Sequence, residues 1–148
     1  MHASIPLLGR ALLSAIFVLS GIGKLTGFDG TVSYIASVGL PMPQLLGLGA
    51  IAVELIGSAM LILGWKTRWA ASAMLLYTAA TALLFHNFWS APGDQMQNQM
   101  IHFMKNIAMS GGFLYVLAFG AGEWSLDAKR ALRGSARQDN RLMPQSPG

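Results

Sequence analysis

Long apolar stretches separated by short polar turns dominate the chain. Stretches without a charged side chain lie at residues 11–23, 30–53, 55–65, 69–93 and 106–122. A helix needs about 20 predominantly apolar residues to cross the hydrocarbon core of a bilayer, which is roughly 30 Å thick. Trimmed at their turn-forming residues, these stretches predict four membrane spans, at about 5–25, 43–64, 68–89 and 101–121.

The connection between the first two spans is longer than the others and contains a helical pattern. Apolar residues recur at helical spacing from Phe28 to Val38, and Asp29 stands where a helix N-cap is expected. The run of Gly and Pro residues at 39–43 would end such a helix. We therefore predict a short helix here that lies at the membrane interface or folds back into the membrane.

The composition supports a membrane protein. Charged residues make up 11% of the chain and hydrophobic residues 53%, whereas soluble domains carry roughly 25% charged residues. This composition excludes an ordinary soluble enzyme, a disordered chain and a nucleic-acid binder. The chain has no cysteine, which excludes disulfide and thiolate chemistry. The predicted fold class is an all-α integral membrane protein, a four-transmembrane-helix bundle with a short helix after the first span.

The basic residues predict an orientation. Two of them lie in the 65–68 turn, and five follow the last span: Lys129, Arg130, Arg133, Arg137 and Arg141. Short cytoplasmic loops are rich in Lys and Arg, so both termini are expected in the cytoplasm and the 26–42 and 90–100 loops outside. We expect the first span to remain uncleaved. Residues 1–127 then form the bundle, and 128–148 form a flexible basic tail that sets topology or contacts anionic lipid.

One carboxylate lies in the middle of a predicted span. Glu54 shares a helical face with small residues, which let neighbouring helices approach closely: Gly47, Ala50, Gly57 and Ser58. A charged side chain at the bilayer centre costs about 2.5–3.5 kcal/mol. We therefore predict that Glu54 points into the bundle and pairs with another helix, with Lys105 as the favoured partner. A structural ion pair and a proton- or ligand-binding group are equally compatible with this position.

Further polar and aromatic residues gather near the outer ends of three spans. They are Lys24, His86, Trp89, His102, Lys105 and Asn106. With Glu54 somewhat deeper, they predict a polar pocket that opens outward. No metal is expected, because no helix carries a HxxxH or ExxH spacing and Lys105 disfavours a cation. Arg10, near the inner surface, is expected to reach toward the headgroups.

Several motifs in order along the chain resemble a known family. They are Arg10 with GIGKL at 21–25, GLPMP at 39–43, Glu54, LGWKTR at 63–68, FHNFW at 85–89, the 99–112 run and GEWSLD at 122–127. Together they resemble the DoxX/DoxX-like family of small bacterial inner-membrane proteins. The resemblance implies a four-helix bundle in the inner membrane. Some members are subunits of a thiosulfate:quinone oxidoreductase, but the lack of cysteine argues against thiol or persulfide chemistry here.

Two functional hypotheses follow. The first is a quinone-linked redox subunit, in which His86, His102 or Lys105 donates to the quinone and Glu54 relays a proton. Such a subunit would bind a quinone and work with a partner redox subunit or a second copy of itself. The alternative is a non-catalytic subunit or scaffold of a larger complex, with the polar cluster joining the helices. A transporter is disfavoured, because no internal repeat or broken span is visible.

Overall fold

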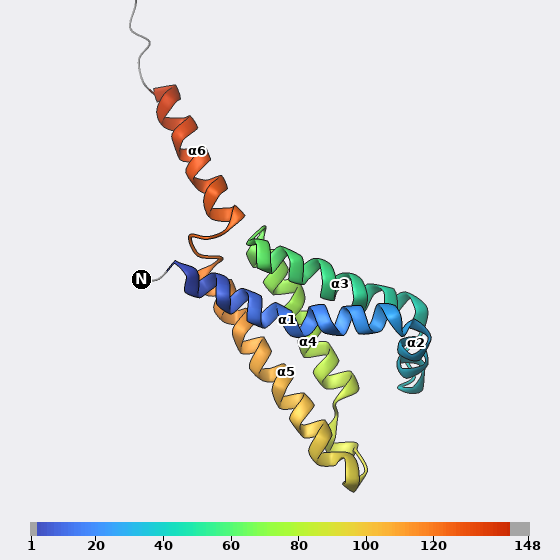
Figure 1. The fold of residues 1–148 in the computed structure, drawn as a ribbon. Helices are drawn as coiled ribbons and strands as arrows, with labels where there is room; N and C mark the ends of the chain where they lie inside the picture. Colours follow the sequence, from blue (N-terminus) through green and yellow to red (C-terminus); the bar gives the residue numbers. More distant parts are fainter. Residues whose placement is uncertain (1–2, 143–148) are drawn as a thin grey trace, which may run out of the picture.

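A computed structural model of the chain describes residues 3–142, and every regular element in that range is helical (Figure 1). In chain order these elements are α1 (Ser4–Thr26), α2 (Phe28–Ser37), α3 (Pro43–Leu63), α4 (Thr67–Phe85), the short 3-10 helix η1 (Phe88–Ser90), α5 (Gly93–Phe119) and α6 (Leu126–Leu142). The described chain therefore has the predicted all-α class.

Within residues 3–142, three helical segments are long and apolar enough to cross a membrane: Ser4–Thr26, Pro43–Leu63 and Thr67–Ser90. They coincide with the first three predicted spans. The region of the fourth lies within α5, which begins earlier than expected, at Gly93. The first two turns of α5 are rich in Asp, Gln and Asn, so the helix continues outside its apolar part. The protein is thus an all-α integral membrane protein, and the fourth crossing stays a prediction.

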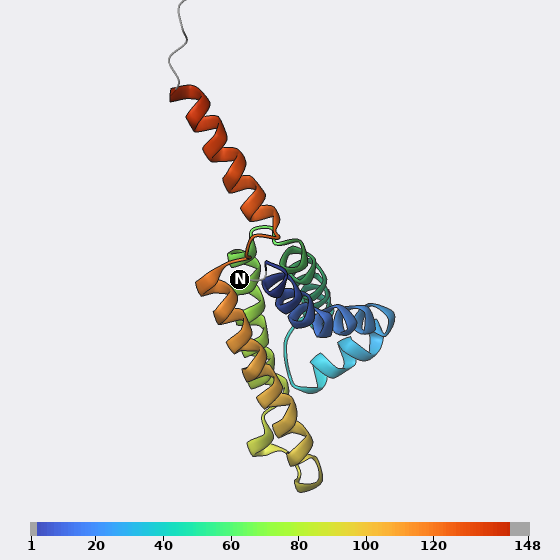
Figure 2. The ribbon, with the colours of Figure 1, turned by 60° about the vertical axis from the view of Figure 1, so that its left-hand side comes forward.

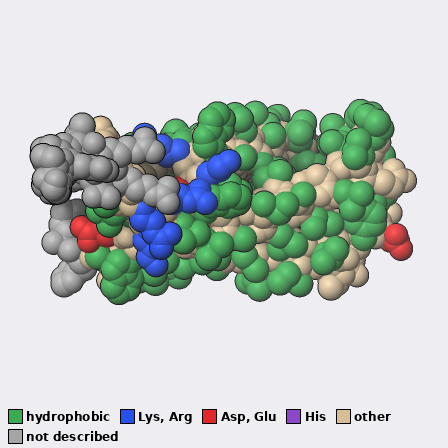
Figure 3. All heavy atoms as spheres, turned by 90° about the horizontal axis from the view of Figure 1, so that it is seen from above, with side chains coloured by type: hydrophobic (Ala, Val, Ile, Leu, Met, Phe, Trp, Pro, Cys, Tyr) green, Lys and Arg blue, Asp and Glu red, His purple; other side chains and the backbone are tan. Residues whose placement is uncertain are grey.

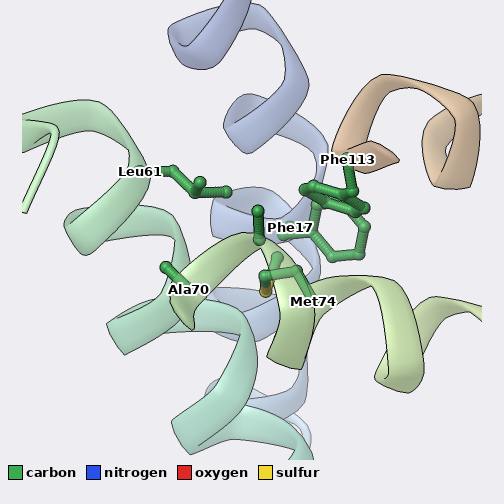
Figure 4. Close-up of a cluster of buried hydrophobic side chains, with 6 residues drawn as sticks. Phe17, Leu61, Ala70, Met74 and Phe113 are labelled. Carbon is green, nitrogen blue, oxygen red and sulfur yellow. The ribbon is translucent and has the colours of Figure 1, made fainter. Parts of the chain in front are cut away.

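Four helices meet in one buried core. Helix α1 packs along α3, α4 packs along α5, and α3 joins the two pairs through α4; Figure 2 shows α4 and α5 side by side. The core consists of Phe17, Leu61, Ala70, Ala71, Met74 and Phe113, most of which Figure 4 labels. The rings of Phe17 and Phe113 lie 5.6 Å apart between centroids. Helices distant in sequence are therefore joined through this one core.

Glycines set how closely the helices approach. A Cβ atom on Gly21 of α1 would lie 2.7 Å from the Leu55 side chain, and one on Gly57 of α3 would lie 2.6 Å from the sulfur of Met74. Both distances are shorter than a van der Waals contact. Any larger residue would push the helices apart, as the small residues on the Glu54 face predicted.

The predicted short helix after the first span is confirmed as α2. It packs against α3, and its Ile35 is buried. Gly47 of α3 lies so close that a Cβ on it would be 3.2 Å from the Phe28 ring. Gly39, with a φ of +77°, follows the helix, and Pro43 occupies the first turn of α3.

The basic segment after the bundle forms a helix over its described part. Helix α6 projects away from the other helices (Figures 1 and 2). The Ser125 hydroxyl accepts a hydrogen bond from the Ala128 N–H at 3.1 Å, as an N-cap does. Ala, Leu, Arg and Lys, all good helix formers, predominate in the turns that follow. The rest of the predicted tail, 143–148, lies outside the described residues.

Arg10 does not reach toward the headgroups, as the sequence suggested. Its side chain is only 2% exposed. It donates to the carbonyls of Leu61 and Ile62 at the end of α3, and to that of Trp124 at 2.7 Å. Carbonyls in the last turn of a helix lack partners within the helix. Arg10 therefore joins α1, the end of α3 and the segment before α6.

Candidate functional site

Glu54 lies midway along α3, and its side chain is buried, as predicted. The residue is 3% exposed. Its Oε1 accepts hydrogen bonds from the Tyr77 hydroxyl at 2.7 Å, from Lys24 Nζ at 2.8 Å and from the Ser20 hydroxyl at 3.1 Å. Its Oε2 accepts a second bond from Lys24 at 3.0 Å. The carboxylate is thus held from two sides, by α1 and by α4.

The predicted pairing of Glu54 with Lys105 is wrong, because the cationic partner is Lys24. Lys24 and Ser20 are one helical turn apart on α1 and hydrogen-bond to each other. Since α1 packs along α3, this turn faces the carboxylate. Lys105 lies on α5, which packs mainly on α4, and its side chain has a different partner.

A second polar group lies near the end of α4 and the start of the apolar part of α5. The rings of His86 and His102 stack, with centroids 5.1 Å apart. Gln99 Oε1 lies 3.0 Å from His86 Nδ1, and Lys105 Nζ lies 3.1 Å from His102 Nδ1. A lysine ammonium can only donate. The proton of a neutral His102 therefore sits on Nε2.

Both polar groups border one cavity of about 800 Å³ that is lined by residues of α1 to α5. Of the residues predicted to form the pocket, the lining includes Lys24, Glu54, His86, Lys105 and Asn106. His102 is connected to it through its contacts with His86 and Lys105. Trp89 is not part of the pocket, contrary to the prediction, because it is exposed and packs against Phe88 and Phe103.

Two lining residues of α5 have capacity left for a ligand. Asn106 is 6% exposed, and within the described chain its side-chain amide has no hydrogen-bond partner. Lys105 forms no ion pair with any described acidic residue. Lys24 and Glu54 neutralise each other, so the cavity carries a net positive charge while the histidines are neutral. Such a site suits a ligand with hydrogen-bond acceptors, such as carbonyl oxygens, on an otherwise apolar body.

The sequence analysis did not single out Ser20, Tyr34 and Tyr77, which also line the cavity. A signal was present for two of them. Ser20 stands four residues before Lys24, and Tyr77 places a hydroxyl in the middle of an otherwise apolar stretch. The hydroxyl of Tyr34 on α2 lies 3.4 Å from the Phe85 carbonyl at the end of α4. This contact places α2 against the cavity.

The helical fold and the partly buried Lys24–Glu54 ion pair define a small integral membrane protein with an internal polar site. The DoxX family model matches residues 5–87, and the chain belongs to this family. The match includes Lys24, Glu54 and His86 but ends before Lys105 and Asn106. No solved structure is a significant match to the chain.

Named relatives support the same assignment. The chain is 39% identical to "Inner membrane protein YphA" of Escherichia coli, over 83% of this chain and 88% of that protein. It is 35% identical to "Inner membrane protein YqjF" of the same organism, over 82% of this chain and 88% of that protein. A shorter match, 36% identical over 42% of this chain and 45% of the relative, is to "Putative oxidoreductase CatD" of Bacillus subtilis.

Proposed function

We propose that this protein is a quinone-linked redox subunit of the bacterial inner membrane and that its cavity binds the quinone head. The observation that carries the proposal is the cavity of about 800 Å³, in which, within the described chain, the Asn106 amide has no hydrogen-bond partner and Lys105 has no carboxylate partner. Its volume is within the roughly 300–1,000 Å³ of small-molecule sites. The name of the Bacillus subtilis relative, an oxidoreductase, supports the same class of chemistry.

The roles of the residues follow from their hydrogen-bonding capacity. Lys105 and the Asn106 amide are donors on adjacent positions of α5, and His86 lies on the same lining. A bound quinone would accept electrons from a partner redox subunit. Lys105 would stabilise the negative charge that develops on the head, because a fixed cation is most effective in a site of low polarity. His102, which accepts from Lys105, would orient the ammonium group.

Glu54 is placed to exchange a proton with the cavity. Three donors hold Oε1, whereas Oε2 has one. Oε2 therefore keeps free acceptor capacity. Tyr77 connects the carboxylate to α4, and Lys24, which is partly exposed, connects it to the outer end of α1. This arrangement would give a proton a route between the quinone head and the outer side. The outer side is the one opposite the two termini, which we expect in the cytoplasm.

The test is to measure bound quinone. Protein purified in mild detergent should release about one quinone per chain on solvent extraction, and emptied protein should bind added short-chain ubiquinone. Lys105→Met should weaken this binding about tenfold or more, because a buried acceptor loses a charged donor worth roughly 1.5–3 kcal/mol. Lys66→Met, which removes a cation from an exposed turn, is the matched control. Protein that is folded, contains no quinone and binds none contradicts the proposal.

One observation favours the alternative, a non-catalytic scaffold. The Glu54 carboxylate already has four hydrogen bonds within the protein, which is what a purely interhelical contact requires. A scaffold would never contain a ligand, and Lys105→Met would leave every binding measurement unchanged.

A further inference from the structure

Basic side chains from two distant segments gather at one end of the molecule. Lys66 lies in the turn between α3 and α4 and Arg68 in the first turn of α4, whereas Lys129, Arg130 and Arg133 belong to the first two turns of α6. All five are exposed. Figure 3 shows Lys and Arg side chains concentrated at this end. The cavity and the ion pair of the proposed site use none of them.

Trp65 joins the two segments. Lys66 Nζ lies 5.6 Å from the centroid of its indole ring, and the Arg130 guanidinium lies 5.9 Å from it. Both distances are within the range of cation–π contacts. Two cations from different elements thus share one aromatic ring. The fold therefore holds the cluster together, and its members are not independent surface charges.

The nearest carboxylate does not neutralise the cluster through direct ion pairs. Asp127 accepts hydrogen bonds from the N–H of Lys66, the N–H of Thr67 and the Thr67 hydroxyl, each at 2.8 Å. The Asp127 N–H donates in turn to the Gly64 carbonyl. These bonds fasten the start of α6 to the α3–α4 turn. They hold the basic side chains together and leave a net positive surface.

Exposed aromatic residues indicate that the cluster lies in the headgroup layer of the membrane. Exposed tryptophans, Trp69 and Trp124, lie at the same end. Tryptophan is enriched where a membrane protein passes through the headgroup layer. Arg133 lies six residues after Asp127, about 9 Å along the helix at 1.5 Å per residue. This distance is comparable to the Debye length at physiological ionic strength, about 8 Å, so Arg133 still acts on a charge bound near the start of α6.

We propose that the α3–α4 turn and the first two turns of α6 form a binding site for anionic phospholipid headgroups. The phosphate oxygens would accept from Lys66 and Arg130, with Arg133 completing the site. A soluble acidic partner is the less favoured occupant, because the cluster begins at the ends of the membrane helices rather than at the far end of α6. This inference does not depend on quinone binding.

The experiment compares lipids in nanodiscs made from equal parts of phosphatidylglycerol and phosphatidylcholine. Native mass spectrometry of the released protein reports which lipid it retains. The wild type should retain phosphatidylglycerol preferentially. The triple variant Lys66→Gln, Arg130→Gln, Arg133→Gln should lose about 100-fold of that preference, at about 1 kcal/mol per basic residue. The matched control Lys66→Arg, Arg130→Lys, Arg133→Lys keeps every charge and should keep the preference.

Salt provides a second measurement on the unmodified protein, which holds even if the triple variant fails to fold. Ionic strength of 0.5 M should greatly reduce the preference, because exposed charges are then screened. A wild type that retains both lipids equally would overturn the proposal. So would a preference that survives both high salt and removal of the three charges.

Discussion

The two partners of the Lys24–Glu54 ion pair differ in how much the loss of the other would cost. The carboxylate is buried, whereas the Lys24 side chain is 28% exposed. Removing the lysine charge leaves a buried carboxylate with only two hydroxyl donors. Removing the glutamate charge leaves an ammonium that still reaches solvent or lipid headgroups. A buried ion pair is costly mainly when one partner is deleted and the other cannot find solvent.

Lys24→Met should therefore destabilise the protein more than Glu54→Gln does. We expect a loss of about 3 kcal/mol for Lys24→Met, the lower end for stranding a buried charge. For Glu54→Gln we expect about 1 kcal/mol, since glutamine keeps the volume and accepts from Tyr77. Thermal unfolding in one detergent measures both, with Lys66→Met as the exposed-lysine control. Equal losses, or the reverse order, would contradict this assignment of the burial cost.

Asn106 separates ligand binding from stability. Because its amide has no hydrogen-bond partner in the described chain, Asn106→Leu should leave the unfolding temperature unchanged or raise it slightly. The same change should weaken quinone binding about tenfold, since a donor to a buried carbonyl is worth roughly 1–3 kcal/mol. Met109→Leu, another lining residue without a polar group, is the control for shape. If Asn106→Leu binds quinone like the wild type, the amide is not an anchor.

At the scale of elements, helix ends are satisfied by partners far away in sequence. Arg10 of α1 donates to the last carbonyls of α3, and Asp127 of α6 accepts from the first N–H groups of α4. Groups at helix ends lack the regular i to i−4 partners of the helix interior, and the Leu61 carbonyl has only the Gly64 N–H as a local partner. The close packing of Gly64 supports the same junction, because a Cβ on it would lie 2.4 Å from Ser125. One end of the molecule is therefore closed by contacts between α1, α3, α4 and α6.

The Asp127 contact makes this junction sensitive to acid. Burial raises the pKa of Asp127, but the hydrogen bonds from Thr67 and Lys66 and the charge of Arg130 outweigh it and lower the pKa below its ordinary value. A carboxylate with a depressed pKa stabilises the fold above its unfolded pKa, near 4, and loses that contribution as pH falls through the folded pKa.

Asp127→Ala should consequently cost about 1 kcal/mol at neutral pH, as loss of a helix cap does. The difference from the wild type should shrink as the pH falls below 4. Unfolding curves collected from pH 7 to pH 3 measure it, with Asp29→Ala, in the first turn of α2, as the carboxylate control. A difference that stays constant over this range would rule out the charged form of Asp127 as the source.

At the scale of the whole molecule, helices α1 to α5 line the cavity, and the two helix pairs share one core that adjoins it at Phe17. The outside of α1, α3 and α4 exposes many large apolar side chains, including Leu8, Leu19, Leu48 and Leu76. These residues are suited to lipid, because water would not tolerate so large an apolar surface. The polar groups that a bilayer would exclude instead face inward.

This arrangement makes the orientation testable. If the end that carries Arg10, Lys66 and α6 faces the cytoplasm, as the excess of basic residues predicts, a reporter fused after residue 148 should be active only in the cytoplasm. A reporter inserted in the 90–100 loop should be active only outside. The two fusions control for each other. A C-terminal reporter that is active outside would reverse the topology and place the cavity on the cytoplasmic side.

The sequence by itself determined the class of the protein, three apolar spans, the short helix after the first span and the burial of Glu54. These follow from local rules, because the length of an apolar run and the cost of a charge in lipid do not depend on which helices are neighbours. It also placed Lys24, His86, Lys105 and Asn106 among the residues of one pocket.

Only the tertiary structure determined which side chains on different helices contact each other. Ser14 and Phe17 share the buried face of α1 with Arg10, but the carbonyls that Arg10 binds come from the end of α3 and from Trp124. The choice of Lys24 over Lys105 as the partner of Glu54 depends on α1, not α5, packing along α3. The same holds for Asp127, whose partners lie at the start of α4. Periodicity assigns a residue to a face, whereas pairing depends on the register between helices, which arises from packing around Gly21 and Gly57.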